Sequence, residues 1–178
     1  MLLYPYWQPQ IRGLNHFPGR GPVLLVVNHP TLFDPFLVAA ATPRPLDFLV
    51  DHRVFKIPVL GPMIARAGGV TVRPGHNSLS EALRRLAQGR AVVVFPEAEQ
   101  THTLELRPFR SGASVLAVQS GVPVIPLGLS GPERLSTARG AWVVGGSIRM
   151  HFGPPLQALA QESPQQFEQR LRAALAAQ

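Results

Sequence analysis

Residues 23–34 read VLLVVNHPTLFD, and this stretch decides the fold class from which the rest follows. It opens with an unbroken run of Val and Leu, a pattern that predicts a buried β-strand. Polar residues follow directly, with His29 and Asp34 placed where the strand ends. Strand ends are a usual location for catalytic groups in α/β proteins, so this pair is the first candidate for a functional site.

The spacing of His29 and Asp34 requires an irregular backbone if the two side chains are to meet. On an ideal helix the intervening residues turn the chain by about 500°, which leaves the side chains roughly 140° apart. Pro30 and Pro35 favour the irregular arrangement, with His29 in a loop and Asp34 near a helix N-terminus. The carboxylate could then hold one ring nitrogen and leave the other as a base. A histidine that is merely hydrogen-bonded at a strand end is the alternative, and the spacing alone does not separate the two.

Strand-like and helix-like segments alternate along the chain through residue 128. Strands are expected at 23–27, 47–50, 70–73, 91–95, 123–128, 141–144 and 147–152, and helices at 34–41, 58–66, 78–88, 111–120 and 164–177. The alternation predicts an α/β sheet with many parallel neighbours. Gly145 and Gly146 then join two short strands as a hairpin. We therefore expect a mixed, mostly parallel sheet flanked by helices, in one domain that spans residues 1–178.

The last helix carries the clearest boundary signals. Ser163 is a candidate N-cap, Pro164 suits the first helical position, and Gln166 completes a capping box. One apolar stripe runs along this helix and consists of Phe167, Leu171, Ala174 and Leu175. The stripe predicts packing on the sheet, with membrane insertion as the less favoured alternative because it is short.

Composition excludes several classes of protein. Hydrophobic residues make up 46% of the chain and charged residues 15%, which argues against disorder. The absence of cysteine excludes a disulfide framework, a thiolate nucleophile and a Cys-ligated zinc. The six histidines show no ligand spacing, so a metal site is not expected. We expect no bound cofactor either. No apolar run approaches the ~20 residues that span a bilayer and no signal-peptide pattern is present, which predicts a cytoplasmic protein.

The net charge of +7 is almost entirely due to arginine, since Lys56 is the only lysine. Such a charge favours peripheral contact with anionic lipid on the inner face of the cell membrane, although a scattered solvated surface is equally consistent with it. Residues 1–7 are apolar and aromatic and could lie at a lipid interface or cover the edge of the core. Nucleic acid is a disfavoured partner, because the arginines are scattered and aromatic residues are few.

Three further blocks follow the first in a definite order. Residues 68–73 read GGVTVR, residues 92–97 read VVVFPE, and residues 122–127 read VPVIPL. Together with the first block they resemble the glycerolipid acyltransferase family, typified by lysophosphatidic acid (1-acylglycerol-3-phosphate) acyltransferase, over about residues 12–130. Residues 106–113, LRPFRSGA, also resemble the segment after the family's third motif. Four ordered blocks are far more specific than any one of them.

The resemblance implies an enzyme of phospholipid biosynthesis. The implied reaction moves a fatty acyl group from a thioester, on coenzyme A or acyl carrier protein, to a hydroxyl of a lysophospholipid such as 1-acylglycerol-3-phosphate. His29 would take the proton of the attacking hydroxyl, and Asp34 would fix the tautomer of the ring. A thiol has a pKa near about 8.5 and leaves readily as the thiolate, so no enzyme nucleophile is required.

The resemblance also assigns four residues to the binding of substrate: Gly69, Arg73, Glu97 and Pro126. Arg73 would hold the acceptor's phosphate with its guanidinium fork. Glu97 would orient Arg73 or the acceptor hydroxyls, and Pro126 would shape the acyl or acceptor pocket. The plainer alternatives are a surface arginine, a carboxylate at a helix start and a proline in a buried strand.

The third block departs from the family pattern. The family usually has Phe-Pro-Glu-Gly-Thr-Arg-Ser, whereas residues 95–101 read FPEAEQT. Gln100 replaces the arginine, and Glu99 adds a negative charge. A carboxylate about 6 Å from a phosphate, at an effective dielectric near 20, costs roughly 3 kcal/mol per unit of phosphate charge before screening. The alternatives are therefore an O-acyltransferase for a less phosphate-dependent lipid or polyol, or a non-catalytic lipid-binding relative, against which the intact His29 and Asp34 argue.

Overall fold

Strands and helices alternate along most of the chain. The computed structural model describes residues 7–28, 34–58, 60–72, 78–96, 111–131 and 146–178. The strands are β1 (Trp7–Arg12), β2 (Val23–Val27), β3 (Leu46–Asp51), β4 (Gly69–Val72), β5 (Ala91–Val94), β6 (Val124–Ser130) and β7 (Gly146–Phe152). The helices are α1 (Asp34–Ala41), α2 (Leu60–Arg66), α3 (Ser78–Ala87), α4 (Gly112–Ser120) and α5 (Pro164–Ala176), with short 3-10 turns η1 (Leu14–His16) and η2 (Val54–Lys56).

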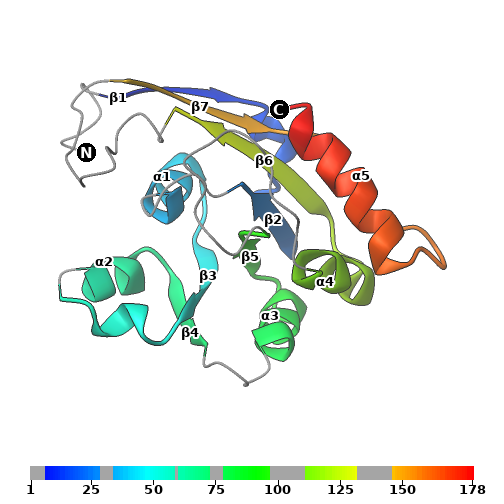
Figure 1. Cartoon of the computed structure of the whole chain (residues 1–178), viewed down its shortest axis with the longest axis horizontal. Helices are drawn as coiled ribbons and strands as arrows, with labels where there is room; N and C mark the ends of the chain where they lie inside the picture. The colour runs from blue at the N-terminus through cyan, green and yellow to red at the C-terminus, as the bar shows by residue number, and fades with distance from the viewer. Residues whose placement is uncertain (1–6, 29–33, 59, 73–77, 97–110, 132–145) are drawn as a thin grey trace.

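The strands form one seven-stranded sheet in the order β1-β7-β6-β2-β5-β3-β4 (Figure 1). From β6 to β4 all neighbours are parallel, whereas β7 runs antiparallel to β6 and pairs with β1 in parallel. This arrangement confirms the mixed, mostly parallel sheet predicted from the sequence. The expected strand at 141–144 lies outside the described residues. Gly146, expected in a hairpin turn, is instead the first residue of β7 and pairs with Trp7 of β1.

β1 is an edge strand that the sequence did not lead us to expect. Its residues alternate between apolar and polar, which is a strand signal, but Pro9 argues against a strand inside a sheet. The structure resolves the conflict by placing β1 at the edge, where a residue that cannot donate a hydrogen bond is tolerated. Residue 7, which we expected at a lipid interface or over the core, begins this strand.

Two apolar clusters pack on opposite faces of the sheet. β2 lies at the centre, and residues 23–27 are all buried. Leu25 belongs to the cluster that includes Val38 of α1, whereas Leu24 belongs to the cluster that includes residues of α3, α4 and α5. Full burial of one such leucine stabilises the fold by about 1.5–3 kcal/mol. β2 is therefore covered on both sides, as its unbroken apolar run predicts.

The predicted capping box of α5 is present. The amide N–H of Gln166 donates to Ser163 Oγ at 3.3 Å, and the amide N–H of Ser163 donates to Gln166 Oε1 at 2.9 Å. The stripe residues Phe167, Leu171 and Leu175 are buried in the core, so the predicted packing on the sheet is confirmed. No helix within the described ranges is both long enough and apolar enough to cross a bilayer.

A buried ion pair fixes the start of β3. The Asp47 side chain is 2% exposed and accepts hydrogen bonds from Arg90 Nη2 at 2.6 Å and Arg85 Nη1 at 3.1 Å. Burial alone would raise the pKa of the Asp47 carboxyl, but the hydrogen bonds and charges of Arg90 and Arg85 outweigh it and hold that pKa below its usual value. The carboxylate thus remains charged and ties β3 to α3 and to the residue before β5.

Candidate active site

The candidate site begins where β2 ends, and Asn28 fixes that point. Backbone pairing of β2 with β6 extends to Val27 opposite Leu127. One residue later, Asn28 Nδ2 donates to the carbonyl of Leu129 at 2.8 Å, and the N–H of Leu129 donates to Asn28 Oδ1 at 2.7 Å. The Asn28 side chain therefore continues the hydrogen-bond ladder in place of the backbone, and the backbone leaves the sheet at this residue. This anchors the residue directly before His29, which itself lies outside the described residues.

Asp34 lies at the position that the sequence predicts, as the first residue of α1. Its side chain is 0% exposed. A carboxylate is favoured there because the N–H groups of the first helical turn carry partial positive charge. Pro35 follows at a position where its missing N–H breaks no helical hydrogen bond. The contact between Asp34 and His29 remains a prediction.

The topology brings the other motif-bearing strands to the same edge of the sheet. β2, β5 and β4 are linked through parallel pairs, so their C-terminal ends point the same way. β5 neighbours β2 and leads towards Glu97, while β4 is the third strand from β2 and leads towards Arg73. Adjacent strands are separated by about 4.8 Å, which puts the axis of β4 roughly 14 Å from β2. Arg73 and Glu97 lie outside the described residues, so their contacts remain predictions.

The approach to Glu97 is fixed by aromatic packing. The Phe95 ring stacks on that of Phe48 in β3, with centroids 6.4 Å apart and an interplanar angle of 13°. Pro96 is buried next to it. Offset aromatic pairs of this kind contribute about 0.5–1.5 kcal/mol beyond the burial of their surface. Phe95 and Pro96 are thus anchored to the core before Glu97 is reached.

Gly69 and Pro126 both have structural reasons for their identity. A Cβ at Gly69 would collide with the side chain of Ile64 in α2, so only glycine allows α2 to approach β4 this closely. Pro126 lies buried inside β6 opposite Val26, and its carbonyl accepts from Gly153 N–H at 2.8 Å. The ladder between β6 and β7 begins only at the next residue, so the missing N–H costs no bond on that side. Contact of either residue with substrate remains a prediction.

Asn28 was not among the residues predicted from the sequence, and its substitution tests its role. We expect Asn28→Ala to lower the free energy of unfolding by about 1–3 kcal/mol, because it leaves the N–H and carbonyl of Leu129 without partners. If His29 acts as the expected base, the rate of its reaction per folded molecule should fall by more than about tenfold, or 1.4 kcal/mol, because the residue before His29 loses its anchor. Urea unfolding and a thioester assay measure the two effects.

The matched control is Gln157→Ala, which also removes an amide that bonds a backbone carbonyl. Gln157 Nε2 donates to the carbonyl of Gly121 at 3.2 Å in an exposed position. This variant should change the unfolding free energy by less than about 0.5 kcal/mol and leave the rate unaltered. If Asn28→Ala loses stability but keeps the full rate per folded molecule, Asn28 holds β6 and does not position His29.

The fold and the site together define an α/β protein with candidate catalytic groups at the C-terminal ends of the parallel strands. Residues 8–130 match the family model described as Acyltransferase. The chain therefore belongs to the acyltransferase family, which confirms the resemblance seen in the four sequence blocks. The solved structure of the 1-acyl-sn-glycerophosphate acyltransferase PlsC from Thermotoga maritima has the same fold, with a TM-score of 0.80 and 22% identity over 95% of this chain and 69% of that one.

Two curated relatives differ in their named acceptors. The chain is 26% identical over 161 residues to the 1-acyl-sn-glycerol-3-phosphate acyltransferase BAT2 of Brassica napus chloroplasts, covering 86% of this chain and 46% of that protein. It is 34% identical over 116 residues to a lyso-ornithine lipid O-acyltransferase of Pseudomonas aeruginosa, covering 62% of this chain and 44% of that protein. The chain thus spans about half the length of these relatives.

Proposed function

We propose that the chain catalyses transfer of a fatty acyl group from a thioester to the hydroxyl of a lysolipid, as a step of phospholipid biosynthesis. The observation that carries this proposal is the anchored end of β2, where Asn28 holds the chain beside His29 and the buried Asp34 begins α1. Family membership over residues 8–130 supports the same class of reaction.

In the proposed mechanism His29 removes the proton of the acceptor hydroxyl as its oxygen attacks the thioester carbonyl carbon. Asp34 holds the ring in the correct tautomer and stabilises the imidazolium that forms. The carbon–sulfur bond then breaks, and the thiolate leaves and regains a proton from the imidazolium. The products are the acylated lipid and a free thiol, on coenzyme A or acyl carrier protein.

The reaction is tested by measuring the free thiol that purified protein releases. Acyl-CoA and acyl carrier protein loaded with the same chain are each offered with a panel of lysolipid acceptors in mixed micelles. We expect release that depends on the acceptor, with a labelled diacyl product in equal amount. Absence of acceptor-dependent release with both donors would contradict the proposal, whereas release without acceptor would indicate a thioesterase.

Two acceptor classes are supported. The relatives named for 1-acyl-sn-glycerol-3-phosphate favour a phosphomonoester lysolipid. The lyso-ornithine lipid relative favours an acceptor named for an amino acid rather than a glycerol phosphate. Glu99 and Gln100 favour the second class, because together they make the third block more acidic by about two charge units than the usual family motif.

The double change Glu99→Thr with Gln100→Arg is expected to raise activity on lysophosphatidate by at least about tenfold, which is 1.4 kcal/mol or half the estimated repulsion. The reason is that it removes a carboxylate and restores a guanidinium beside the acceptor's phosphate. We also expect Arg73→Ala to cost more with a phosphomonoester acceptor than with a neutral or zwitterionic one. Values of kcat and KM for matched acceptors measure both effects.

α5 offers a matched control, because Glu168 and Gln169 form the same dipeptide within this helix. Glu168→Thr with Gln169→Arg makes the same change of charge and should not alter acceptor preference. If the unmodified protein already prefers lysophosphatidate and the change at 99 and 100 leaves that preference intact, the departure from the family motif has no effect on the acceptor. Other arginines would then supply the phosphate site.

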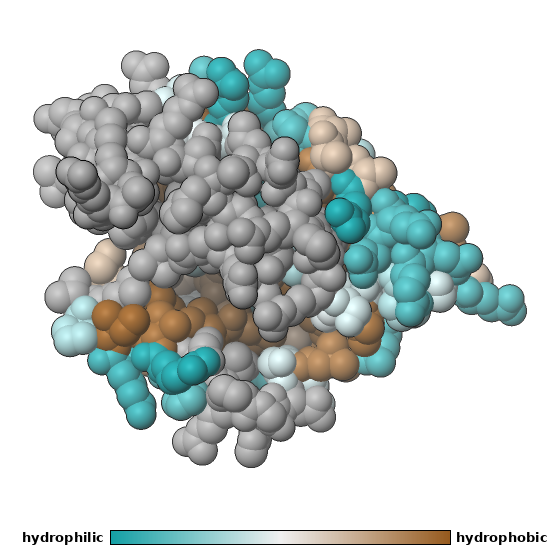
Figure 2. Space-filling view, viewed as in Figure 1, coloured by the Kyte–Doolittle hydropathy of each residue, from teal (hydrophilic) through white to brown (hydrophobic). Residues whose placement is uncertain are grey.

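We also propose peripheral contact with anionic lipid, which for a cytoplasmic protein is the inner face of the cell membrane. The supporting feature is the segment of η2 and α2, where the exposed side chains of Ile57 (46%) and Met63 (42%) lie close in the chain to the exposed cations Lys56 and Arg66. Figure 2 shows hydrophobic surface beside hydrophilic surface at the end of the molecule that carries α2.

Co-sedimentation with anionic vesicles should therefore fall as salt rises, because screening shortens the electrostatic field to about 8 Å at physiological ionic strength. Ile57→Ser with Met63→Ser should weaken binding at every salt concentration, since it removes the apolar part of the contact. Binding that is unaffected by salt, or the absence of binding at low salt, would contradict the proposed contact with anionic lipid.

A further inference from the structure

The two edge strands β1 and β7 differ in chemistry between their two faces. Their parallel register pairs Gln10 with Arg149 and Arg12 with His151, and side chains of paired residues project to the same face. The alternate residues of β7, which include Met150, are buried in the cluster with α1. The paired polar residues therefore lie on the opposite face, away from α1.

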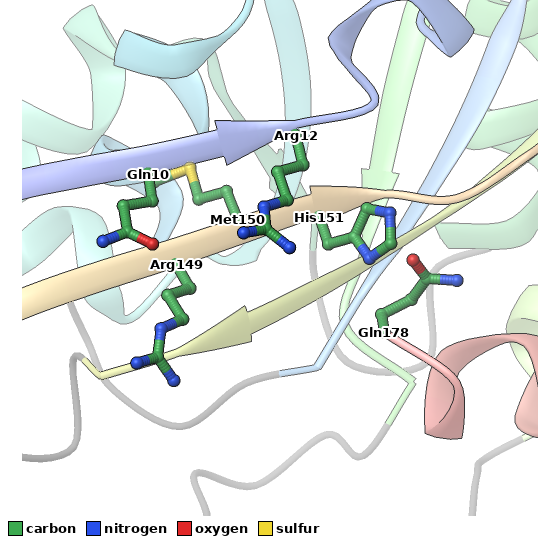
Figure 3. A pocket seen from close by; sticks show the side chains of 6 residues that line it. All are labelled: Gln10, Arg12, Arg149, Met150, His151 and Gln178. Atoms are coloured by element: carbon green, nitrogen blue, oxygen red, sulfur yellow. The ribbon is translucent and has the colours of Figure 1, made fainter.

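These side chains surround a hollow of about 280 Å³. Its lining residues are Gln10, Arg12, Arg149, Met150, His151 and Gln178 (Figure 3). The close-up shows the two arginines projecting from neighbouring strands, with the His151 ring between Arg12 and Gln178. α5 packs on β6 and ends at Ala176, so the helix itself does not extend over this face.

Gln178 adds a polar atom without a partner. Its Nε2 donates to the carbonyl of Ala174 at 2.9 Å, which holds the carboxamide in place. Its Oε1 is buried, and it accepts no hydrogen bond from the residues that the structure describes. A buried acceptor in this state destabilises the fold, and a hydroxyl group that enters the hollow and donates to it would remove that cost.

The arginines of the hollow differ from most others in the described ranges. Arg85 and Arg90 bind Asp47, Arg84 binds Glu81, and Arg170 binds Glu162. Within the same ranges the guanidinium groups of Arg12 and Arg149 have no hydrogen bond or ion pair. Like charges held on adjacent strands repel each other, so this face is stabilised when an anion lies between them.

We infer that this hollow, the β1–β7 pocket, binds a phosphoryl group. Two guanidinium forks on a rigid sheet match the oxygens of a phosphate, and each fork can donate two parallel hydrogen bonds. His151 and the carboxamide of Gln10 supply further donors. Gln178 Oε1 accepts from a hydroxyl, either of a protonated phosphate or of the group that carries it. The pocket lies on the face opposite α1 and uses none of the residues of the proposed active site.

The test follows the His151 ring by NMR while inorganic phosphate is added to the full chain at constant ionic strength. We expect its signals to shift with saturation, and the dissociation constant to rise at least about tenfold in Arg12→Gln with Arg149→Gln. A matched control, Arg20→Gln with Arg84→Gln, removes the same charge from exposed sites and should bind phosphate like the unmodified protein. Acetate tests whether the pocket distinguishes phosphate from a carboxylate.

Three results would overturn the inference: no response of His151 to phosphate, an equal response in the Arg12 and Arg149 variant, or acetate that binds as tightly as phosphate. Arg12→Lys with Arg149→Lys guards against a folding defect, because it keeps both charges and removes only the forks. It should unfold at the same urea concentration as the unmodified protein and still bind phosphate more weakly. Equal binding by this lysine variant would show that the pocket responds to charge alone.

Vesicles then assign the source of the phosphoryl group. If it belongs to a lipid headgroup, the Arg12 and Arg149 glutamine variant should lose at least about tenfold in binding to phosphatidylglycerol vesicles relative to the Arg20 and Arg84 control. If both variants bind vesicles equally while phosphate still shifts His151, the ligand is a soluble phosphate ester, and glycerol 3-phosphate should displace inorganic phosphate. Either result supports the pocket, and neither depends on acyl transfer.

Discussion

The substitution His29→Ala is expected to reduce acyl transfer by about 10²–10⁴-fold, because a positioned general base contributes an acceleration of that size. The hydroxyl of a lysolipid is a weak nucleophile at neutral pH, and the proposed mechanism has no other group that takes its proton. The loss should appear mainly in kcat, since the ring is proposed to act on the proton and not to hold the lipid. The measurement is thiol release with donor and acceptor at saturation.

A second histidine separates catalysis from folding. His16, the last residue of η1, forms a hydrogen bond from its ring Nδ1 to the carbonyl of Phe152 at 2.8 Å. His16→Ala should lower the unfolding free energy by about 1 kcal/mol and keep the rate per folded molecule. His29→Ala should keep the unfolding free energy and lose the rate per folded molecule. Thioester turnover by His29→Ala at the unmodified rate would exclude His29 as the base.

The elements that the sequence predicts well are those whose signals are local. β2 is marked by an unbroken apolar run, and α5 by a capping box and an apolar stripe, so each is specified within its own residues. β1 is different, because its partner β7 lies more than a hundred residues along the chain and Pro9 opposes a strand. Local patterns contain no information on such pairing, and the position of β1 beyond β7 could not be predicted from them.

The same distinction applies to the candidate site. Asp34 was placed at a helix start because Pro35 and the end of the preceding apolar run are neighbours in the sequence. The bridge from Asn28 to Leu129 joins positions 101 residues apart, and no local pattern marks either of them as a pair. An amide between a buried strand and a candidate base is the one signal that could have pointed to Asn28. Gly69 packs closely on Ile64, a contact that the family motif does not indicate, and its contact with substrate remains a prediction.

Asp34→Asn is expected to lower kcat by at least about a hundredfold and to leave measurable turnover, because the base remains while control of its tautomer is lost. The side chain is buried and Asn has nearly the same shape, so the packing around α1 should be kept. The lost charge at the helix N-terminus should cost about 0.3–1 kcal/mol of unfolding free energy.

The pH profile distinguishes an orienting role from a merely structural one. A carboxylate beside His29 favours the imidazolium, so its removal should lower the apparent pKa of the base and move the acidic limb of kcat/KM to lower pH. Asp47→Asn is the matched control, because it also neutralises a buried carboxylate, but on β3 and bound to Arg90 and Arg85. That variant should lose stability and keep both the rate per folded molecule and the pH profile. If Asp34→Asn also keeps the profile of the unmodified protein, Asp34 supports the start of α1 and does not act on His29.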